Sequence, residues 1–147
     1  MYRVGPINAA SKQRQFARWL NNAKINPGLI YYYPIKAMLH AWAGQSIDLA
    51  LDSTTLWDRF TLVRLALIYR GLAIPISWVV LTSASASVAF KDYKIILLQA
   101  AWVLPLTCQV MLLADWGFDD VALMQHVRDL GWGFRTRLKS SIWVHRA

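Results

Sequence analysis

Two aspartates, Asp52 and Asp115, each follow a short apolar stretch of the sequence. In the stretch 46–55 apolar residues alternate with polar or small ones, which is typical of a strand with one buried face. The stretch 109–114 is also strand-like, and Asp115 comes directly after it. Mg²⁺ and Mn²⁺ bind carboxylate oxygens, and two such ions can stabilise both the attacking and the leaving oxygen when a phosphodiester is cleaved. If the two strands are neighbours, the aspartates therefore predict a divalent-metal site for cutting and joining DNA.

The elements that must position these aspartates follow from hydrophobic periodicity and from turn residues. Two helices followed by β-β-β-α-β-α-β are expected, in a mixed α/β fold. The predicted ranges are helices at 11–24 and 34–43, strands at 46–55, 62–70 and 72–81, a helix at 91–105, a strand at 109–114, a helix at 119–130 and a strand at 131–139. A right-handed crossover through the helix at 91–105 would place the last strand before Asp115 parallel to and beside the strand of Asp52.

Prolines refine this prediction at two positions. Pro34 suits the first turn of a helix, so the second helix is expected to begin there, after a break at 26–28. Pro75 lies inside the third predicted strand and has no N–H group to donate to a neighbouring strand. It therefore predicts either an edge strand or a β-bulge at that position.

The composition limits the compartment and the partners of the chain. Its 147 residues suffice for one domain with a core, here 46–147, preceded by a basic helical segment at 1–45. The formal net charge is +8, which favours an anionic partner such as nucleic acid or an anionic membrane surface. All eight acidic residues are aspartates, so the sequence contains no glutamate. The single cysteine, Cys108, and an amino terminus without a secretory signal predict a cytoplasmic protein.

Three segments resemble the DDE transposases of bacterial insertion sequences. They are the block LALDSTT around Asp52, the meander with its AIPISW segment, and the long block VMLLADWGFDDVALMQHVRDLGWGFRTRLK around Asp115. The resemblance extends from about Ser11 to the end of the sequence. One departure is Trp116, which stands where the family usually has arginine.

This resemblance implies an RNase H-like fold with Asp52 and Asp115 as the first two catalytic acids and as metal ligands. The intact family site is expected to hold two Mg²⁺ or Mn²⁺ ions. The family's third acid is a glutamate on a later helix, which this sequence lacks. The chain is therefore expected to be a truncated transposase domain with little or no DNA strand-transfer activity. An uncovered sheet face in such a fragment predicts self-association into a homo-oligomer.

Basic residues at both ends of the chain are expected to contact DNA phosphates. They are Lys12, Arg14, Arg18, Arg135, Arg137 and Lys139. The structural alternative is that these residues form solvated helix and strand faces. Two other interpretations stay open at this point: a DNA-binding remnant without enzymatic activity, and a small membrane protein spanning the bilayer at 71–90 and 95–114, two windows without a charged residue.

The remaining titratable residues are expected to be structural. The three histidines, His40, His126 and His145, lack metal-ligand spacing with one another or with the cysteine. Asp119 and Asp120 suit the positive end of the dipole of the helix that they begin. Asp48 lies at the start of its strand and is expected to be solvated.

Overall fold

The computed structural model of the chain describes residues 9–82 and 88–137. The chain forms two compact units, Met1–Pro34 and Ile35–Ala147, and each is described by itself. The boundary lies within helix α2 (Pro27–His40), because Ile35 and Leu39 in its second half are buried and belong to the second unit.

The first unit holds helix α1 (Ala9–Leu20) and the first half of α2. The prediction that the second helix begins at Pro34 is wrong, since α2 begins at Pro27 and Pro34 lies inside it. The Asn26 side chain explains this start: its Oδ1 accepts a hydrogen bond from the Leu29 amide at 3.2 Å, and proline follows in the favoured first helical position.

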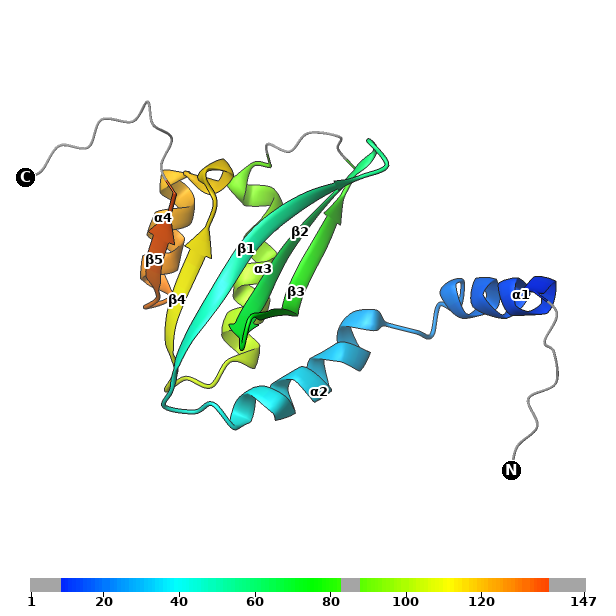
Figure 1. Ribbon diagram of the computed structural model, residues 1–147, viewed down its shortest axis with the longest axis horizontal. Helices are drawn as coiled ribbons and strands as arrows, with labels where there is room; N and C mark the ends of the chain where they lie inside the picture. Colours follow the sequence, from blue (N-terminus) through cyan, green and yellow to red (C-terminus); the bar gives the residue numbers. More distant parts are fainter. Residues whose placement is uncertain (1–8, 83–87, 138–147) are drawn as a thin grey trace, which may run out of the picture. The chain divides into compact units, whose positions relative to one another are not determined.

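The second unit is built on a five-stranded mixed sheet in the order β3-β2-β1-β4-β5 (Figure 1). Strands β1, β2 and β3 are antiparallel neighbours, whereas β4 is parallel to β1 and β5 is parallel to β4. The elements are β1 (Ser46–Leu56), β2 (Phe60–Tyr69), β3 (Leu72–Leu81), α3 (Phe90–Val103), β4 (Gln109–Ala114), the short 3₁₀ helix η1 (Trp116–Phe118), α4 (Val121–Asp129) and β5 (Gly133–Thr136). The predicted β-β-β-α-β-α-β order is confirmed, and η1 is an addition to it.

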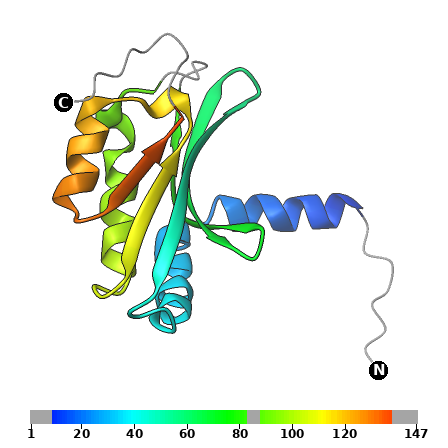
Figure 2. The same ribbon diagram turned by 60° about the vertical axis from the view of Figure 1, so that its left-hand side comes forward.

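The core of the second unit lies between the sheet and helices α3 and α4, which cover the same face of it (Figures 1 and 2). Alternate residues of β1 point to this face, and Leu49 is fully buried there between its strand partners Leu67 and Leu112. Helix α3 contributes the fully buried Ile96 and Leu97. The alternation seen in the sequence of β1 therefore marks the buried face correctly.

Hydrogen bonds at the start of β1 and β4 set the register between these parallel strands. The Gly44 amide donates to Thr107 Oγ1 at 2.9 Å, and the Gln109 amide donates to the Gln45 carbonyl at 3.1 Å. Ser46 consequently lies opposite Gln109, and each later residue of β1 up to Leu51 is paired with the corresponding residue of β4. The two strands thus advance in step toward their carboxyl ends.

Strand β3 is an edge strand, as Pro75 predicts. Its register with β2 also shifts between Leu65, which pairs with Ser77, and Ala66, which pairs with Pro75, so Ile76 is an extra residue. The edge strand and the β-bulge, the two features that a proline without an N–H group predicts, are therefore both present. The buried Ser77 hydroxyl donates to the Ile96 carbonyl at 2.7 Å and ties this irregular part of β3 to α3.

Each of the two turns of the β1–β2–β3 meander has two consecutive residues with positive φ angles, but the turns differ in sequence. Arg70 and Gly71, between β2 and β3, both have positive φ angles of 50° and 77°. Trp57 and Asp58, between β1 and β2, have φ angles of 52° and 48°. Such turns favour glycine or asparagine, because a larger L-residue in the left-handed region costs roughly 1–2 kcal/mol. The β1–β2 turn therefore retains strain that a glycine or asparagine would relieve.

The sheet face opposite α3 and α4 carries both apolar and charged side chains. Ile68, Trp78 and Val80 lie on this face and are 38%, 38% and 53% exposed. Asp52 and Arg64 lie beside them on the neighbouring strands β1 and β2. This surface is therefore partly apolar.

Candidate functional site

Asp52 and Asp115 occupy equivalent positions on neighbouring parallel strands. The last residue pair between β1 and β4 is Leu51 with Ala114, and each aspartate is the next residue along its chain. Neighbouring strands are about 4.8 Å apart. The two carboxylates therefore project from adjacent backbones at the level where β4 ends, and both residues are exposed. The expectation that Asp52 ends its strand is wrong, because β1 continues to Leu56 in pairing with β2. The predicted parallel pairing of their strands is confirmed.

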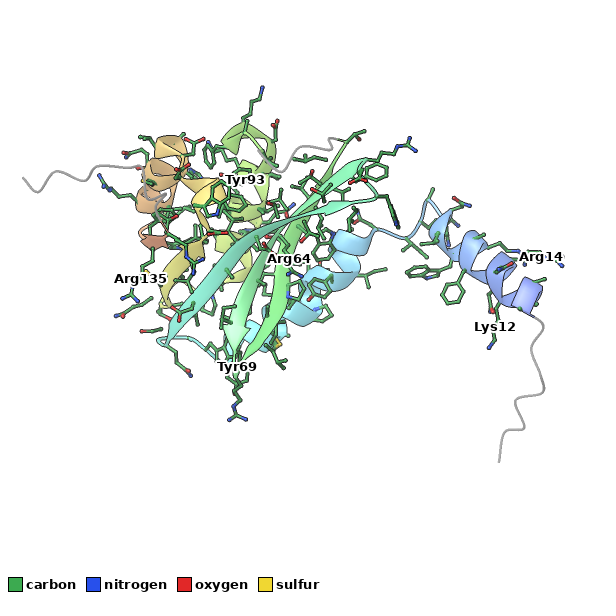
Figure 3. The ribbon with its side chains drawn as sticks, turned by 45° about the horizontal axis from the view of Figure 1, so that its top comes forward. Lys12, Arg14, Arg64, Tyr69, Tyr93 and Arg135 are labelled. Atoms are coloured by element: carbon green, nitrogen blue, oxygen red, sulfur yellow. The ribbon has the colours of Figure 1, made fainter. Side chains whose placement is uncertain are left out.

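Asp52 forms an ion pair with Arg64, which lies directly opposite it on β2. The Arg64 Nη2 atom is 3.0 Å from Asp52 Oδ2, and the two side chains are 42% and 51% exposed, for Arg64 and Asp52 respectively. Figure 3 shows Arg64 on the part of the sheet that the β1–β2–β3 meander forms. An ion pair this exposed contributes about 0.2–1 kcal/mol. A phosphate or a metal ion can therefore compete for either partner at low cost.

Asp115 caps the short helix η1. Its backbone is extended, with φ −80° and ψ 167°, and its Oδ1 atom accepts a hydrogen bond from the Trp116 amide at 2.8 Å. Asp120 has a similar structural role at α4, where its Oδ1 accepts from the Ala122 amide at 2.7 Å. The expectation that Asp120 begins a helix is confirmed. The hydrogen bond from the Trp116 amide fixes the backbone orientation of Asp115.

The end of β5 lies beside Asp115. The Arg137 amide donates to the Ala114 carbonyl at 3.3 Å, and Thr136 Oγ1 donates to the Asp115 carbonyl at 3.4 Å. Arg135 is paired with Leu113 and is exposed at the edge of the sheet (Figure 3). Lys139 lies outside the described residues. Asp115 and Arg137 thus directly follow the ends of β4 and β5, at the level of the sheet where Asp52 lies inside the longer strand β1.

The chemistry of this edge fits a loosely held cation. Asp52 and Asp115 offer carboxylate oxygens, the ligand type of Mg²⁺ and Mn²⁺, and Asp52 already attracts the Arg64 guanidinium. Within residues 9–82 and 88–137, however, there is no group of three or more histidine, cysteine or acidic side chains that could hold a metal ion.

The basic residues of α1 belong to the first unit and form a separate candidate contact. Arg14 and Arg18 are four residues apart and share one side of the helix, while Lys12 points in another direction from Arg14 (Figure 3). The three apolar side chains Phe16, Trp19 and Leu20 are 66%, 55% and 72% exposed. Helix α1 therefore presents an apolar stripe and a pair of arginines on different sides.

His126 on α4 is a structural histidine, as expected from the sequence. Among the described residues, its Nε2 atom is buried without a hydrogen-bond partner, and its ring lies 5.5 Å from that of Phe90. Burial lowers the His126 pKa, the charge of Lys94 lowers it further, and Asp129 partly offsets these effects. His40 is exposed, and His145 lies outside the described residues.

This environment predicts an acid-sensitive contribution to stability. The folded-state pKa of His126 lies below the unfolded value of about 6.5, so protonation favours the unfolded chain. The contribution is complete above pH about 6.5 and is lost as the pH falls below it. His126→Phe should reduce the loss of urea stability between pH 7.5 and 5.5, whereas His40→Phe should leave it unchanged. Equal losses in the wild type and His126→Phe would contradict the assignment.

The two uncharged windows of the sequence do not form single helices. The window 71–90 contains β3, and the window 95–114 is divided between α3 and β4. Across the described part of the chain, no helix combines the length and the apolar character needed to cross a membrane.

Comparisons with known proteins identify no relative of this chain. A scan against models of protein families, a search of curated proteins and a search of solved structures all find no match for this chain. A functional assignment therefore rests on the arrangement of strands, acids and arginines.

Proposed function

We propose that this chain is an RNase H-like domain related to the DDE transposases of insertion sequences, and that it binds DNA. The observation that carries the proposal is that Asp52 and Asp115 both come directly after the last residue pair between β1 and β4, Asp52 inside β1 and Asp115 just past the end of β4. The sheet order β3-β2-β1-β4-β5, with antiparallel β1, β2 and β3 and parallel β4 and β5, supports it. The helix between β3 and β4 supplies the crossover that makes β1 and β4 parallel.

The residues at this edge suit a DNA phosphate. The Arg64 guanidinium group pairs with Asp52, and the backbone of Arg137 lies beside the end of β4, so two arginines belong to this part of the sheet. Guanidinium groups bind phosphate oxygens through paired hydrogen bonds. A bound Mg²⁺ or Mn²⁺ ion would be held by Asp52 and Asp115 and would polarise the phosphodiester. With two acids and no glutamate in the sequence, we expect little strand transfer by this chain alone.

DNA binding tests the proposal directly. The affinity for a duplex of about three helical turns, measured by fluorescence anisotropy, should fall steeply with salt concentration, because each neutralised phosphate contributes about 0.9 to the slope of log K against log salt. Arg137→Gln should weaken binding at low salt and reduce the slope by about 0.9. Arg70→Gln is the matched control, since Arg70 is an exposed arginine in the turn between β2 and β3, at the other end of the sheet.

Two results would count against this proposal. Binding that is insensitive to salt, or that Arg70→Gln and Arg137→Gln weaken equally, would contradict a phosphate contact at the Asp115 edge. A nicking assay in Mn²⁺ addresses the enzymatic part. Robust cleavage that Asp52→Ala abolishes would show that the chain is an active nuclease, and that the third acid is supplied in another way.

A binding-only role is a second candidate function. The Arg64–Asp52 ion pair favours it, because the site neutralises its own carboxylate without a metal ion. In this case DNA binding by the wild type is equally strong in EDTA and in Mn²⁺. Self-association through the face of Ile68, Trp78 and Val80 would accompany either function, and sedimentation analysis would detect it.

A further inference from the structure

The tip of the β1–β2 hairpin combines an exposed tryptophan with an arginine and a second aromatic ring. Trp57 is 86% exposed, and its ring lies 6.5 Å from that of Phe60 in an edge-to-face arrangement. The guanidinium group of Arg59 lies over the Phe60 ring at 5.3 Å from its centre. The hairpin end extends past the end of β3 in both ribbon views (Figures 1 and 2).

The backbone of this tip is unusual for its sequence. The Arg59 amide donates to the Leu56 carbonyl at 3.2 Å and closes a turn in which Trp57 and Asp58 both have positive φ angles. The β2–β3 turn has a glycine at its second left-handed position, but the β1–β2 turn has none. Asp58 tolerates this conformation, whereas Trp57 is a large side chain in a region that favours small ones. The turn thus holds an indole outward at a cost in stability.

The tip lies on the same strand as the candidate acid site. Trp57 follows Asp52 by five residues, and at about 3.3 Å per residue it lies roughly 16 Å farther along the chain. This span corresponds to roughly five steps of a duplex DNA strand, at about 3.4 Å per step. A DNA strand whose phosphate lies near Asp52 would therefore bring bases to the hairpin tip.

The size and charge of the tip favour an unpaired nucleobase over a protein or a lipid bilayer as its partner. The surface area of one tryptophan beside one phenylalanine is far smaller than the roughly 800 Å² that each partner buries in a stable protein interface. Insertion into a bilayer would carry Asp58 and Arg59 with the indole, which is unfavourable. An unpaired nucleobase needs only one aromatic face and a nearby cation for its phosphate, and Trp57 and Arg59 supply both.

We infer that the β1–β2 hairpin tip is a stacking site for an unpaired DNA base, with Trp57 as the stacking ring and Arg59 as the neighbouring phosphate contact. This inference rests on the proposed function and adds the form of DNA that the site prefers. The preferred substrate is a duplex with a bulged or unpaired base a few steps from the bound phosphate.

The test compares two duplexes of equal length, one fully paired and one with a single bulged base, by fluorescence anisotropy at the same salt concentration. The wild type should bind the bulged duplex about tenfold more tightly, in line with the energy of stacking one base on an aromatic ring. Trp57→Asn should remove this preference, and Trp57→Phe should keep most of it. Trp102→Asn is the control, because Trp102 is 72% exposed on α3 and its substitution should leave the preference unchanged.

Thermal unfolding separates a binding role from a structural one. Asparagine tolerates the left-handed conformation, so Trp57→Asn should keep or raise the Tm, by a few degrees at most, while the preference for the bulged duplex is lost. A preference that survives in Trp57→Asn would overturn the inference, even if salt-dependent DNA binding supports the proposed function. So would binding of anionic vesicles, or dimer formation, that depends on Trp57. Absence of binding to either duplex would instead reject the proposed function itself.

Discussion

Leu49→Ala should lower the free energy of unfolding by about 3–5 kcal/mol, one of the largest losses that a single substitution can cause in this chain. Leu49 is fully buried on the central strand β1, between Leu67 on β2 and Leu112 on β4, which are themselves 1% and 0% exposed. Neighbours held in strands on both sides cannot easily move into the cavity. Urea denaturation followed by circular dichroism measures the loss.

Leu72→Ala is the matched control for this prediction. Leu72 begins the edge strand β3 and is 66% exposed, so the same chemical change should cost well under about 1 kcal/mol. Similar losses for the two variants would contradict a core centred on β1. A small loss for Leu49→Ala alone would mean that the sheet and α3 are not tightly packed.

The strands that form this core can be predicted from the sequence because their patterns are strong. Strand β4 has its predicted bounds, and β1 extends only one residue beyond the predicted end. The crossover helix is long and apolar, and Pro105 limits where it can end. The parallel pairing of β1 and β4 then follows from the handedness of crossovers rather than from any local signal.

The ends of other elements are harder to predict, because two signals compete or a distant partner decides. Both Pro27 and Pro34 suit the start of a helix, and the capping bond of the Asn26 side chain decides for Pro27. The sequence predicts the last strand over 131–139, but the pairing of β5 with β4 covers only Gly133–Thr136. A strand ends where its partner ends, and β4 stops at Ala114.

The candidate site can be predicted only in part for a similar reason. Asp52 and Asp115 are marked by the apolar runs before them, whereas Arg64 is one of several arginines in a mixed sequence. Its pairing with Asp52 depends on the exact register of a hairpin whose turn lacks the usual glycine or asparagine. Sequence patterns miss Trp57 for the same reason, because no typical turn residue marks the tip of that hairpin.

Asp52→Asn should weaken Mn²⁺ binding by about tenfold or more, and Arg64→Gln should strengthen it by up to about fivefold. The first substitution removes one of two carboxylate ligands. The second removes a positive charge 3.0 Å from Asp52 Oδ2. The charge competes with the ion, and an exposed ion pair of about 0.2–1 kcal/mol corresponds to a change of up to about fivefold. Electron paramagnetic resonance of free Mn²⁺ at low ionic strength measures both affinities.

The direction of the Arg64 effect is what separates an acid pair that binds cations from two unrelated surface aspartates. Asp115→Asn should weaken Mn²⁺ binding as Asp52→Asn does, because both residues directly follow the last residue pair between β1 and β4. Arg70→Gln removes an arginine from the other end of the sheet and should change the affinity only slightly through the net charge. If Arg64→Gln and Arg70→Gln have equal effects, general electrostatics explain the binding. If DNA displaces Arg64 from Asp52, adding duplex DNA to the wild type should raise the Mn²⁺ affinity toward that of Arg64→Gln, so phosphate binding and metal binding would reinforce each other.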